Sequence, residues 1–172
     1  MSNTEDLLIS ATTKWVSVND FHDLSLRKIS SSVGLTTGAV YKNFKSKQEL
    51  FYKVSLSLSE QLVSDLKLSS SNTPFDNLLA IADFLCNLAV EKPRLIEFLL
   101  FNGSIKEMYQ AKDYNFVFWN LVKKYAGQLK DSEYFLLQIV TTLTGYIQLL
   151  INDLVKYDPK FIAITLKQLL ED

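Results

Sequence analysis

Apolar residues recur at helical spacing along nearly the whole chain, and no segment alternates with the two-residue period of a strand. The pattern therefore predicts an all-α protein. A first helix carries its stripe on Leu8, Ala11, Trp15 and Val18. Turn-forming residues then divide the rest into two short helices within residues 25–44 and longer ones over 47–68, 74–91, 93–103, 109–125, 131–155 and 159–169. We expect an N-terminal domain over residues 1–46 and a helical domain over residues 47–172, with residues 47–68 as the connector.

Residues 25–44 have the spacing of two short helices packed around a sharp turn. Gly34 lies at the corner, where glycine adopts a left-handed backbone without steric penalty. Ser25 and Thr36 stand where a hydroxyl can cap each helix start. The apolar positions that would pack the two helices are Leu26, Ile29 and Val33 on the first and Leu35, Val40 and Phe44 on the second. This arrangement predicts a helix-turn-helix.

The second short helix has the composition of a DNA-reading element. Its first turn, Thr37, Gly38 and Ala39, has almost no bulk, so the helix start can approach base edges in a major groove. Tyr41 and Lys42 follow as donors for phosphates. Lys47 opens the next helix, whose start is defined by the capping box of residues 46–49. The expected DNA-binding residues are Ser25, Arg27, Thr36, Thr37, Gly38, Ala39, Tyr41, Lys42 and Lys47.

Charge is segregated in the same region. Residues 27–53 hold six basic side chains and one acid, a net charge of +5, whereas the whole chain carries −1 and the remainder therefore −6. A concentration of this kind is typical of an electrostatic footprint for nucleic acid, although a solvated basic face would have the same composition.

The N-terminal ~50 residues resemble the DNA-binding domain of the tetracycline-repressor-like (TetR) family of bacterial regulators. The chain departs from the family pattern at Asp20, Leu24, Ser30 and Thr37, where glycine, threonine, alanine and lysine are usual; at position 20 an aspartate tolerates a left-handed turn. The resemblance implies a DNA-binding transcriptional regulator, a homodimer on a palindromic operator, and a small effector in the C-terminal domain. The matching positions are Ile29-Ser30, Val33-Gly34-Leu35-Thr36, Gly38-Ala39-Val40-Tyr41, Phe44 and Ser46-Lys47-Gln48-Glu49-Leu50.

The helix over residues 131–155 is apolar around most of its circumference. A soluble helix of this kind must be covered on all sides, so one face is expected to pack on its own subunit and another on a partner. The alternatives are the central helix of a monomeric bundle and a membrane span, and the polar Gln138 and Gln148 argue against the span. The expected dimer-interface residues are Leu136, Val140, Leu143, Ile147, Ile151, Phe161, Thr165 and Leu169.

Aromatic side chains are frequent in the C-terminal half and could line an apolar effector pocket or fill the core. Asp83 and Glu97 could pair with a cationic ligand if they face inward, and are otherwise exposed to solvent. The expected pocket residues are Phe84, Phe98, Phe101, Tyr114, Phe118, Trp119 and Tyr146. A ligand among them would release DNA by moving the connector.

No phosphate-binding loop, Cys/His cluster or nucleophile motif points to an enzyme, a cofactor or a metal site. His22, the single histidine, is expected at the surface. One cysteine, Cys86, cannot form an internal disulfide, and no signal-like segment opens the chain, so we expect a cytoplasmic protein. The main interpretation is a repressor released by a small, largely apolar effector. The alternative is a helical protein that organises DNA or answers to a protein partner and binds no effector.

Overall fold

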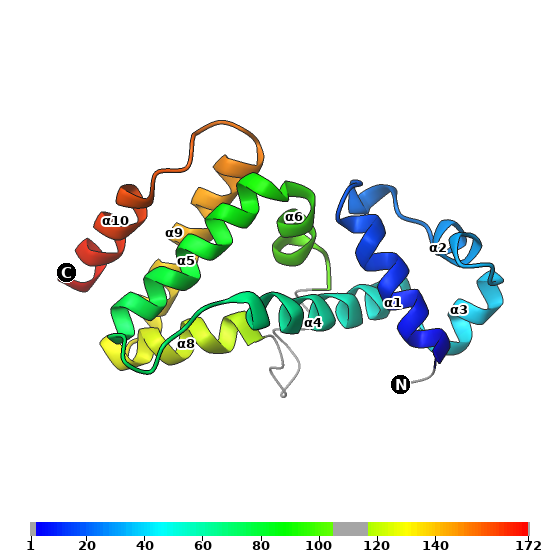
Figure 1. The fold of residues 1–172 in the computed structure, drawn as a ribbon, viewed down its shortest axis with the longest axis horizontal. Helices are drawn as coiled ribbons and strands as arrows, with labels where there is room; N and C mark the ends of the chain where they lie inside the picture. The colour runs from blue at the N-terminus through cyan, green and yellow to red at the C-terminus, as the bar shows by residue number, and fades with distance from the viewer. Residues whose placement is uncertain (1–2, 105–116, 172) are drawn as a thin grey trace.

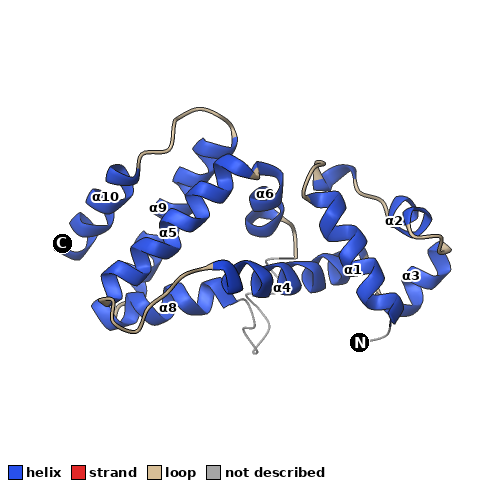
Figure 2. Cartoon of the chain, in the orientation of Figure 1, coloured by secondary structure: helices blue, strands red, loops and turns tan. Residues whose placement is uncertain are grey.

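The computed structural model describes residues 3–104 and 117–171, and within them the chain forms only helices and connecting loops (Figure 2). The all-α prediction is confirmed. In order the elements are α1 (Asn3–Val16), the 3₁₀ helix η1 (Phe21–Asp23), α2 (Leu26–Ser32), α3 (Thr37–Asn43), α4 (Lys47–Asp65), α5 (Pro74–Glu91), α6 (Pro93–Phe101), α8 (Val117–Leu129), α9 (Glu133–Ile151) and α10 (Pro159–Glu171).

Two groups of helices lie at opposite ends of an elongated molecule (Figure 1). Helices α1, α2 and α3 form the N-terminal domain, and α4 runs from beneath it to the second group. In that C-terminal group α5 is central, with α6, α8, α9 and α10 packed against it. Helix α4 contacts α1 of the first group and α6 and α8 of the second, so it links the two groups.

The two groups meet through a cluster of three phenylalanines. Phe21 comes from η1, Phe51 from α4 and Phe98 from α6, and all three are buried. Their ring centroids are 5.1 to 6.1 Å apart, with edge-to-face geometry in each pair. Such pairs stabilise packing beyond simple burial, so this cluster fixes the N-terminal domain against α6.

The first helix is shorter than its apolar pattern predicted. It ends at Val16, and Val18, placed on the buried stripe by the sequence, is 75% exposed beyond the helix. The buried side chains of α1 are instead Leu8, Ile9, Thr12 and Val16. Thr12 fits this position because its hydroxyl donates a hydrogen bond to the Leu8 carbonyl oxygen at 2.8 Å.

Several other helix ends differ from the predicted ones. Helix α4 ends at Asp65 instead of residue 68, and α8 continues through Gly127 to Leu129. Helix α9 starts after Ser132, whose hydroxyl accepts the Phe135 N–H, and it ends at Ile151 instead of Val155. The predicted start at Tyr109 lies outside the described residues.

The early end of α9 has a local cause. Asp153 adopts a left-handed φ of 54°, and the backbone N–H of Leu154 donates to the Leu149 carbonyl at 3.0 Å. This is a helix-terminating turn that satisfies a carbonyl left open at the helix end.

Candidate nucleic-acid interface and ligand cavities

Local hydrogen bonds build the predicted helix-turn-helix. The Ser25 hydroxyl accepts the Lys28 N–H at 3.2 Å, and the Thr36 hydroxyl accepts the Ala39 N–H at 3.3 Å. Gly34 has a φ of +71°, which an L side chain rarely adopts. The caps and the turn therefore lie where the sequence placed them, between α2 and α3.

Helix α3 turns one face inward and leaves the other free. Val40 and, just after the helix, Phe44 are almost completely buried. On the opposite side Gly38, Tyr41 and Lys42 are exposed, whereas Thr37 and Ala39 are half-buried. Thr36, Ser25 and Arg27 are exposed as well. All nine predicted DNA-binding residues thus belong to the α2–α3 unit or to the start of α4.

Gly38 has no steric reason within the chain to be glycine. A Cβ built there would have the Thr36 Oγ1 as its nearest neighbour, at an ordinary contact distance of 3.7 Å. Because Gly38 is exposed, its missing side chain leaves the outer side of the α3 start open.

The basic residues of this region do not share one face. Arg27, Lys42 and Lys45 are exposed around α2 and α3. Lys28, in contrast, donates to the Asp23 carbonyl oxygen at 2.9 Å, and Lys53 lies 4.0 Å from the Glu5 carboxylate on α1. The net +5 of the segment therefore overstates the charge available to a phosphate backbone.

Lys47 is partly turned into the protein. Its Nζ donates to the Leu24 carbonyl oxygen at 2.6 Å and lies 5.1 Å from the centroid of the Phe51 ring. Burial lowers the pKa of this ammonium, and the nearby negative charge of Asp23 opposes that shift. The ammonium holds the η1–α2 junction against α4, which is a structural role that the sequence did not reveal.

Of the two hydrogen bonds that define the predicted capping box at the start of α4, the structure forms the one accepted by the Ser46 hydroxyl. The Ser46 hydroxyl accepts the Glu49 N–H at 3.1 Å, as expected. The Glu49 carboxylate, however, accepts the backbone N–H of Lys45 at 2.5 Å, one residue before the N-cap.

Asp20 does not adopt the left-handed turn expected at its position. Its φ is −66° and its ψ 120°, and its carboxylate accepts the backbone N–H and the ring Nδ1 of His22 at 2.9 and 2.8 Å. These two hydrogen bonds lower the pKa of Asp20. Arg94 of α6 lies 3.9 Å away, so this exposed loop adds a polar contact between the N-terminal domain and α6.

The predicted pocket aromatics separate into three places. Phe98 is in the buried cluster with Phe21 and Phe51, and Phe101 is 38% exposed at the end of α6, so neither lines a C-terminal cavity. Tyr146 packs on Phe161 at a centroid distance of 4.7 Å. In the structure these three side chains do not meet at one cavity, because helical period does not tell which neighbour covers a face. Tyr114 lies outside the described residues.

The remaining predicted aromatics meet at one apolar cavity between α5, α6, α8 and α9. Phe118 and Trp119 line it, and Phe84 stacks on Phe118 with centroids 6.0 Å apart. The volume is about 70 Å³. The other lining residues are Leu85, Leu100, Val122, Val140, Leu143, Thr144 and Ile147.

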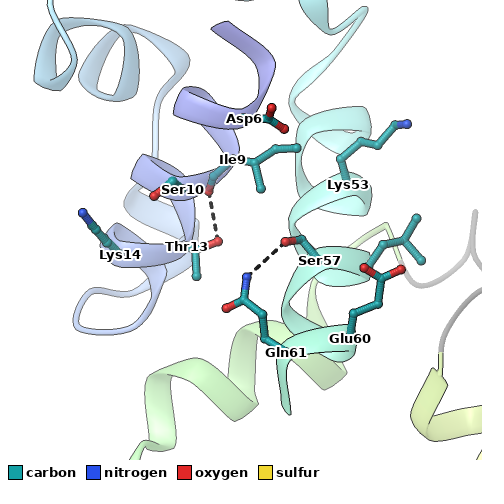
Figure 3. A pocket seen from close by; sticks show the side chains of 10 residues that line it. Asp6, Ile9, Ser10, Thr13, Lys14, Lys53, Ser57, Glu60 and Gln61 are labelled. Atoms are coloured by element: carbon teal, nitrogen blue, oxygen red, sulfur yellow. Dashed lines mark hydrogen bonds between the residues drawn. The ribbon is translucent and has the colours of Figure 1, made fainter. Parts of the chain in front are cut away.

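A second, polar groove of about 480 Å³ separates α1 from α4 (Figure 3). Acids and bases both line it: Asp6 and Lys14 come from α1, and Lys53 and Glu60 from α4. Figure 3 shows that Gln61 is already hydrogen-bonded to Ser57 across one turn of α4. The groove has no net electrostatic preference for a ligand of one sign.

Comparison with known sequences decides the family. The family of bacterial regulatory proteins called the tetR family matches residues 8–54, which span most of α1 through the first half of α4. Residues 8–54 are therefore a DNA-binding domain of the tetR family. The chain is a DNA-binding transcriptional regulator. No curated protein sequence matches the chain.

Solved structures share the fold of the whole tetR-family chain. A TetR transcriptional regulator from Rhodococcus sp. RHA1 matches with a TM-score of 0.72 at 18% identity, covering 97% of each chain. The fatty acid degradation regulator FadR from Bacillus halodurans has a TM-score of 0.63 at 16% identity, covering 99% of this chain and 95% of its own. NalD, the secondary repressor of the MexAB-OprM multidrug efflux pump in Pseudomonas aeruginosa, has a TM-score of 0.61 at 21% identity, covering 98% and 94%.

The apolar surface of this tetR-family chain lies on a different face of α9 from the predicted one. Leu143 and Ile147, assigned to a partner, are buried inside the subunit against α5, α6 and α8. Leu136, Val140, Ile151, Thr165 and Leu169 are half-buried, and only Phe161 of the predicted set is exposed. The exposed apolar residues of α9 and α10 are Tyr134, Leu137, Leu149, Phe161 and Ile164.

Helix α9 is long and apolar enough to cross a membrane by length and composition, with a third of its apolar window buried in the subunit. A core helix of a soluble protein has the same features. Among the described residues, no group of three or more His, Cys, Asp or Glu side chains could hold a metal ion.

Two polar contacts of the C-terminal domain have no signal in the sequence pattern. The Tyr157 hydroxyl donates to the Asp83 carboxylate at 2.5 Å, so Asp83 is not fully solvated. The Tyr146 hydroxyl accepts the Asp158 N–H at 2.9 Å. Together these contacts tie the loop before α10 to α5 and α9. The signal was hidden because the loop residues have no period.

Proposed function

We propose that the protein is a dimeric repressor that reads a palindromic operator with the first turn of α3 and leaves it when a small apolar effector enters the C-terminal domain. One observation supports contact between α3 and DNA bases. The start of α3 is capped by Thr36 and has little side-chain bulk on its outer side, while Val40 on the inner side is completely buried. Thr37 and Ala39 would contact base edges, and Tyr41, Lys42, Arg27, Ser25 and Thr36 would contact phosphates.

Dimerisation is supported by the uncovered apolar face of α9 and α10. Leu137 is 61% exposed and Ile164 57%, and several exposed apolar side chains on two neighbouring helices are typical of an interaction surface. Between Leu137 and Leu149, the exposed Thr141 and Gly145 would let a second α9 approach closely. A second copy seated there by two-fold symmetry would cover α9 and α10 of both subunits.

Effector binding is supported by the cavity around Phe118 and Trp119. Among its described lining residues the hydroxyl of Thr144 already donates to the Val140 carbonyl at 2.7 Å, and most of the others are apolar, so these walls offer a ligand mainly apolar contact. At about 70 Å³ the cavity is far below the several hundred Å³ that a typical ligand fills. An effector must therefore push helices apart, and α6 and α8 both touch the connector α4.

A movement of α6 would also reach the N-terminal domain through Phe98 and Phe21. The displacement would change the separation of the two α3 helices in a dimer, and binding to two half-sites depends on that separation. A repressor is the direction we propose, and the structural neighbour NalD is described as a repressor.

The test is equilibrium binding of the purified protein to operator DNA selected from its own genome. Sequence preference that changes with Thr37→Ala, together with release by apolar compounds that raise the melting temperature, would support the proposal. Tight binding without sequence preference, and no compound that alters it, would favour a protein that organises DNA.

A further inference from the structure

A cleft of about 400 Å³ opens where the N-terminal domain, the connector and the end of α6 meet. It is distinct from the apolar cavity around Trp119, with which it shares no lining residue. Its walls include Phe21 and His22 of η1, Lys47, Gln48 and Phe51 of α4, and Phe101 of α6. A single occupant would therefore touch all three parts of the molecule.

The apolar part of the cleft is aromatic. Phe21 and Phe51 are buried and packed edge to face, so they form a rigid wall. Phe101 is 38% exposed although its neighbours in α6, Phe98 and Leu99, are completely buried. The His22 ring stacks on Phe21 with centroids 4.0 Å apart. Flat rings on these sides favour a flat, apolar ligand body.

The polar part is the Lys47 ammonium. An ammonium has three N–H donors, and among the described residues the Leu24 carbonyl oxygen accepts one of them. Lys47 is also held in place by the ring of Phe51, and its partial burial disfavours the charged form. A bound anion would restore the balance, because an opposite charge stabilises the ammonium.

The charge of the cleft is one-sided. Among the described residues that line it there is no acid, although Asp23 acts on Lys47 from nearby and Asp20 holds the Nδ1 of His22. The groove between α1 and α4 has acids and bases in equal number, so it lacks this preference. Charge and shape together select an aromatic acid over an amine or a neutral sugar.

We propose that this cleft is a second ligand site of the protein and binds a small aromatic carboxylate. The carboxylate accepts hydrogen bonds from the Lys47 ammonium, and the ring lies among Phe21, Phe51 and Phe101. An occupied cleft keeps the Lys47 ammonium turned into the protein and fixes η1 against α6. An effect of the ligand on DNA binding rests on the proposed DNA-reading role, whereas binding to the cleft does not.

The test measures binding of 2-naphthoate to the full chain by isothermal titration calorimetry without DNA, so that its failure is separate from a failure of operator binding. The expected dissociation constant is about 1 mM or tighter for a ligand of this size. Lys47→Gln should weaken binding by about tenfold or more, because a hydrogen bond to a charged partner is lost. Phe101→Ala should weaken it by about three- to tenfold, since one aromatic wall is removed.

The matched control is Lys53→Gln, the same change on the same helix at a lysine that lines the other groove. It should leave the affinity unchanged. If Lys47→Gln lowers the melting temperature, the neutral 2-naphthalenemethanol gives an independent test on the unaltered protein and should bind about tenfold more weakly than 2-naphthoate. Equal affinity of the unaltered protein, Lys47→Gln and Phe101→Ala for 2-naphthoate would overturn the proposal, as would no binding at 5 mM, on the order of five times the expected constant.

Discussion

The N-terminal and C-terminal domains differ in where their chemistry is encoded. In the α2–α3 unit, caps, turn and exposed face all arise from residues at most a few positions apart: Ser25 caps through Lys28, Thr36 through Ala39, and Gly34 makes the turn. In the C-terminal domain, each apolar surface depends on which distant helix covers it. The caps and the turn can therefore be predicted from one sequence, whereas the exposed apolar surfaces of the C-terminal domain can be identified only in the packed structure.

The largest expected effect concerns the exposed apolar face of α9 in the C-terminal domain. Replacing both Leu137 and Leu149 by glutamate places charges on the exposed face of α9 and should prevent pairing of two subunits, with operator affinity falling about a hundredfold or more. Sedimentation velocity measures the assembly. Val90→Glu, an equally exposed apolar position on α5, is the control and should leave the assembly intact. A double variant that sediments like the unaltered protein would contradict the proposed interface.

Two phenylalanines that the sequence could not distinguish should differ strongly in stability. Phe98→Ala removes a fully buried ring that contacts Phe21 and Phe51, and should lower the free energy of unfolding by about 3–5 kcal/mol. Phe101→Ala, at a 38% exposed position, should cost less than about 1.5 kcal/mol. Urea denaturation monitored by circular dichroism compares them. Similar losses would show that Phe101 belongs to the core.

Two glycines of the N-terminal domain, Gly34 and Gly38, should respond differently to replacement by alanine. Gly34→Ala forces a side chain into a left-handed backbone and should cost about 1–2 kcal/mol of stability. Gly38→Ala meets no close neighbour and lies in a helix, so stability should stay the same or rise by up to about 1 kcal/mol. The same Gly38 variant should bind operator DNA more weakly, as gel-shift titration would show. Undiminished DNA binding would mean that the start of α3 does not approach the bases.

Lys42 and Lys47 should differ in role. Lys42 is expected to contact phosphate, and Lys47 to support the structure. Lys42→Ala removes an exposed charge, and the slope of log affinity against log salt should flatten by about 0.9 per subunit, with the same loss for every sequence. Lys47→Gln should instead lower stability by about 1 kcal/mol, because the Leu24 carbonyl loses its donor. Fluorescence anisotropy at several salt concentrations and thermal melts give both quantities. A changed sequence preference in Lys42→Ala would contradict its phosphate role.

The smallest effect concerns alkaline pH. Burial and the hydrogen bond to Asp83 raise the pKa of Tyr157 above its ordinary value of 10.0. The neutral phenol is thus favoured in the folded state, so its contribution is complete below pH 10 and is lost as the pH rises through the folded pKa. Stability of the unaltered protein should therefore fall more steeply above pH 10 than that of Tyr157→Phe. Parallel curves would show that this hydrogen bond is not formed.

Sequence reasoning found the fold class and the helix-turn-helix because period, caps and glycine act over short distances. It assigned Leu143 and Ile147 to a partner, whereas both are buried inside the subunit, since a helix that is apolar all round does not show which side faces its own core. It also treated the aromatics as one set. In the fold Phe98 packs on Phe51 between the two domains, Tyr146 packs on Phe161, and Trp119 lines the apolar cavity. The inward turn of Lys47 depends on Leu24, which is 23 residues away, so no local pattern could show it.

Selection of bound duplexes from random DNA by the unaltered protein tests the central claim most directly. Two copies, each with one α3 in a major groove, should enrich a pair of inverted half-sites whose centres lie about one helical turn, ~34–36 Å, or slightly more apart. The enriched half-site should change for Thr37→Ala and stay the same for Lys42→Ala. A single unrepeated site, or no enriched sequence at all, would contradict a dimer that reads DNA through the start of α3.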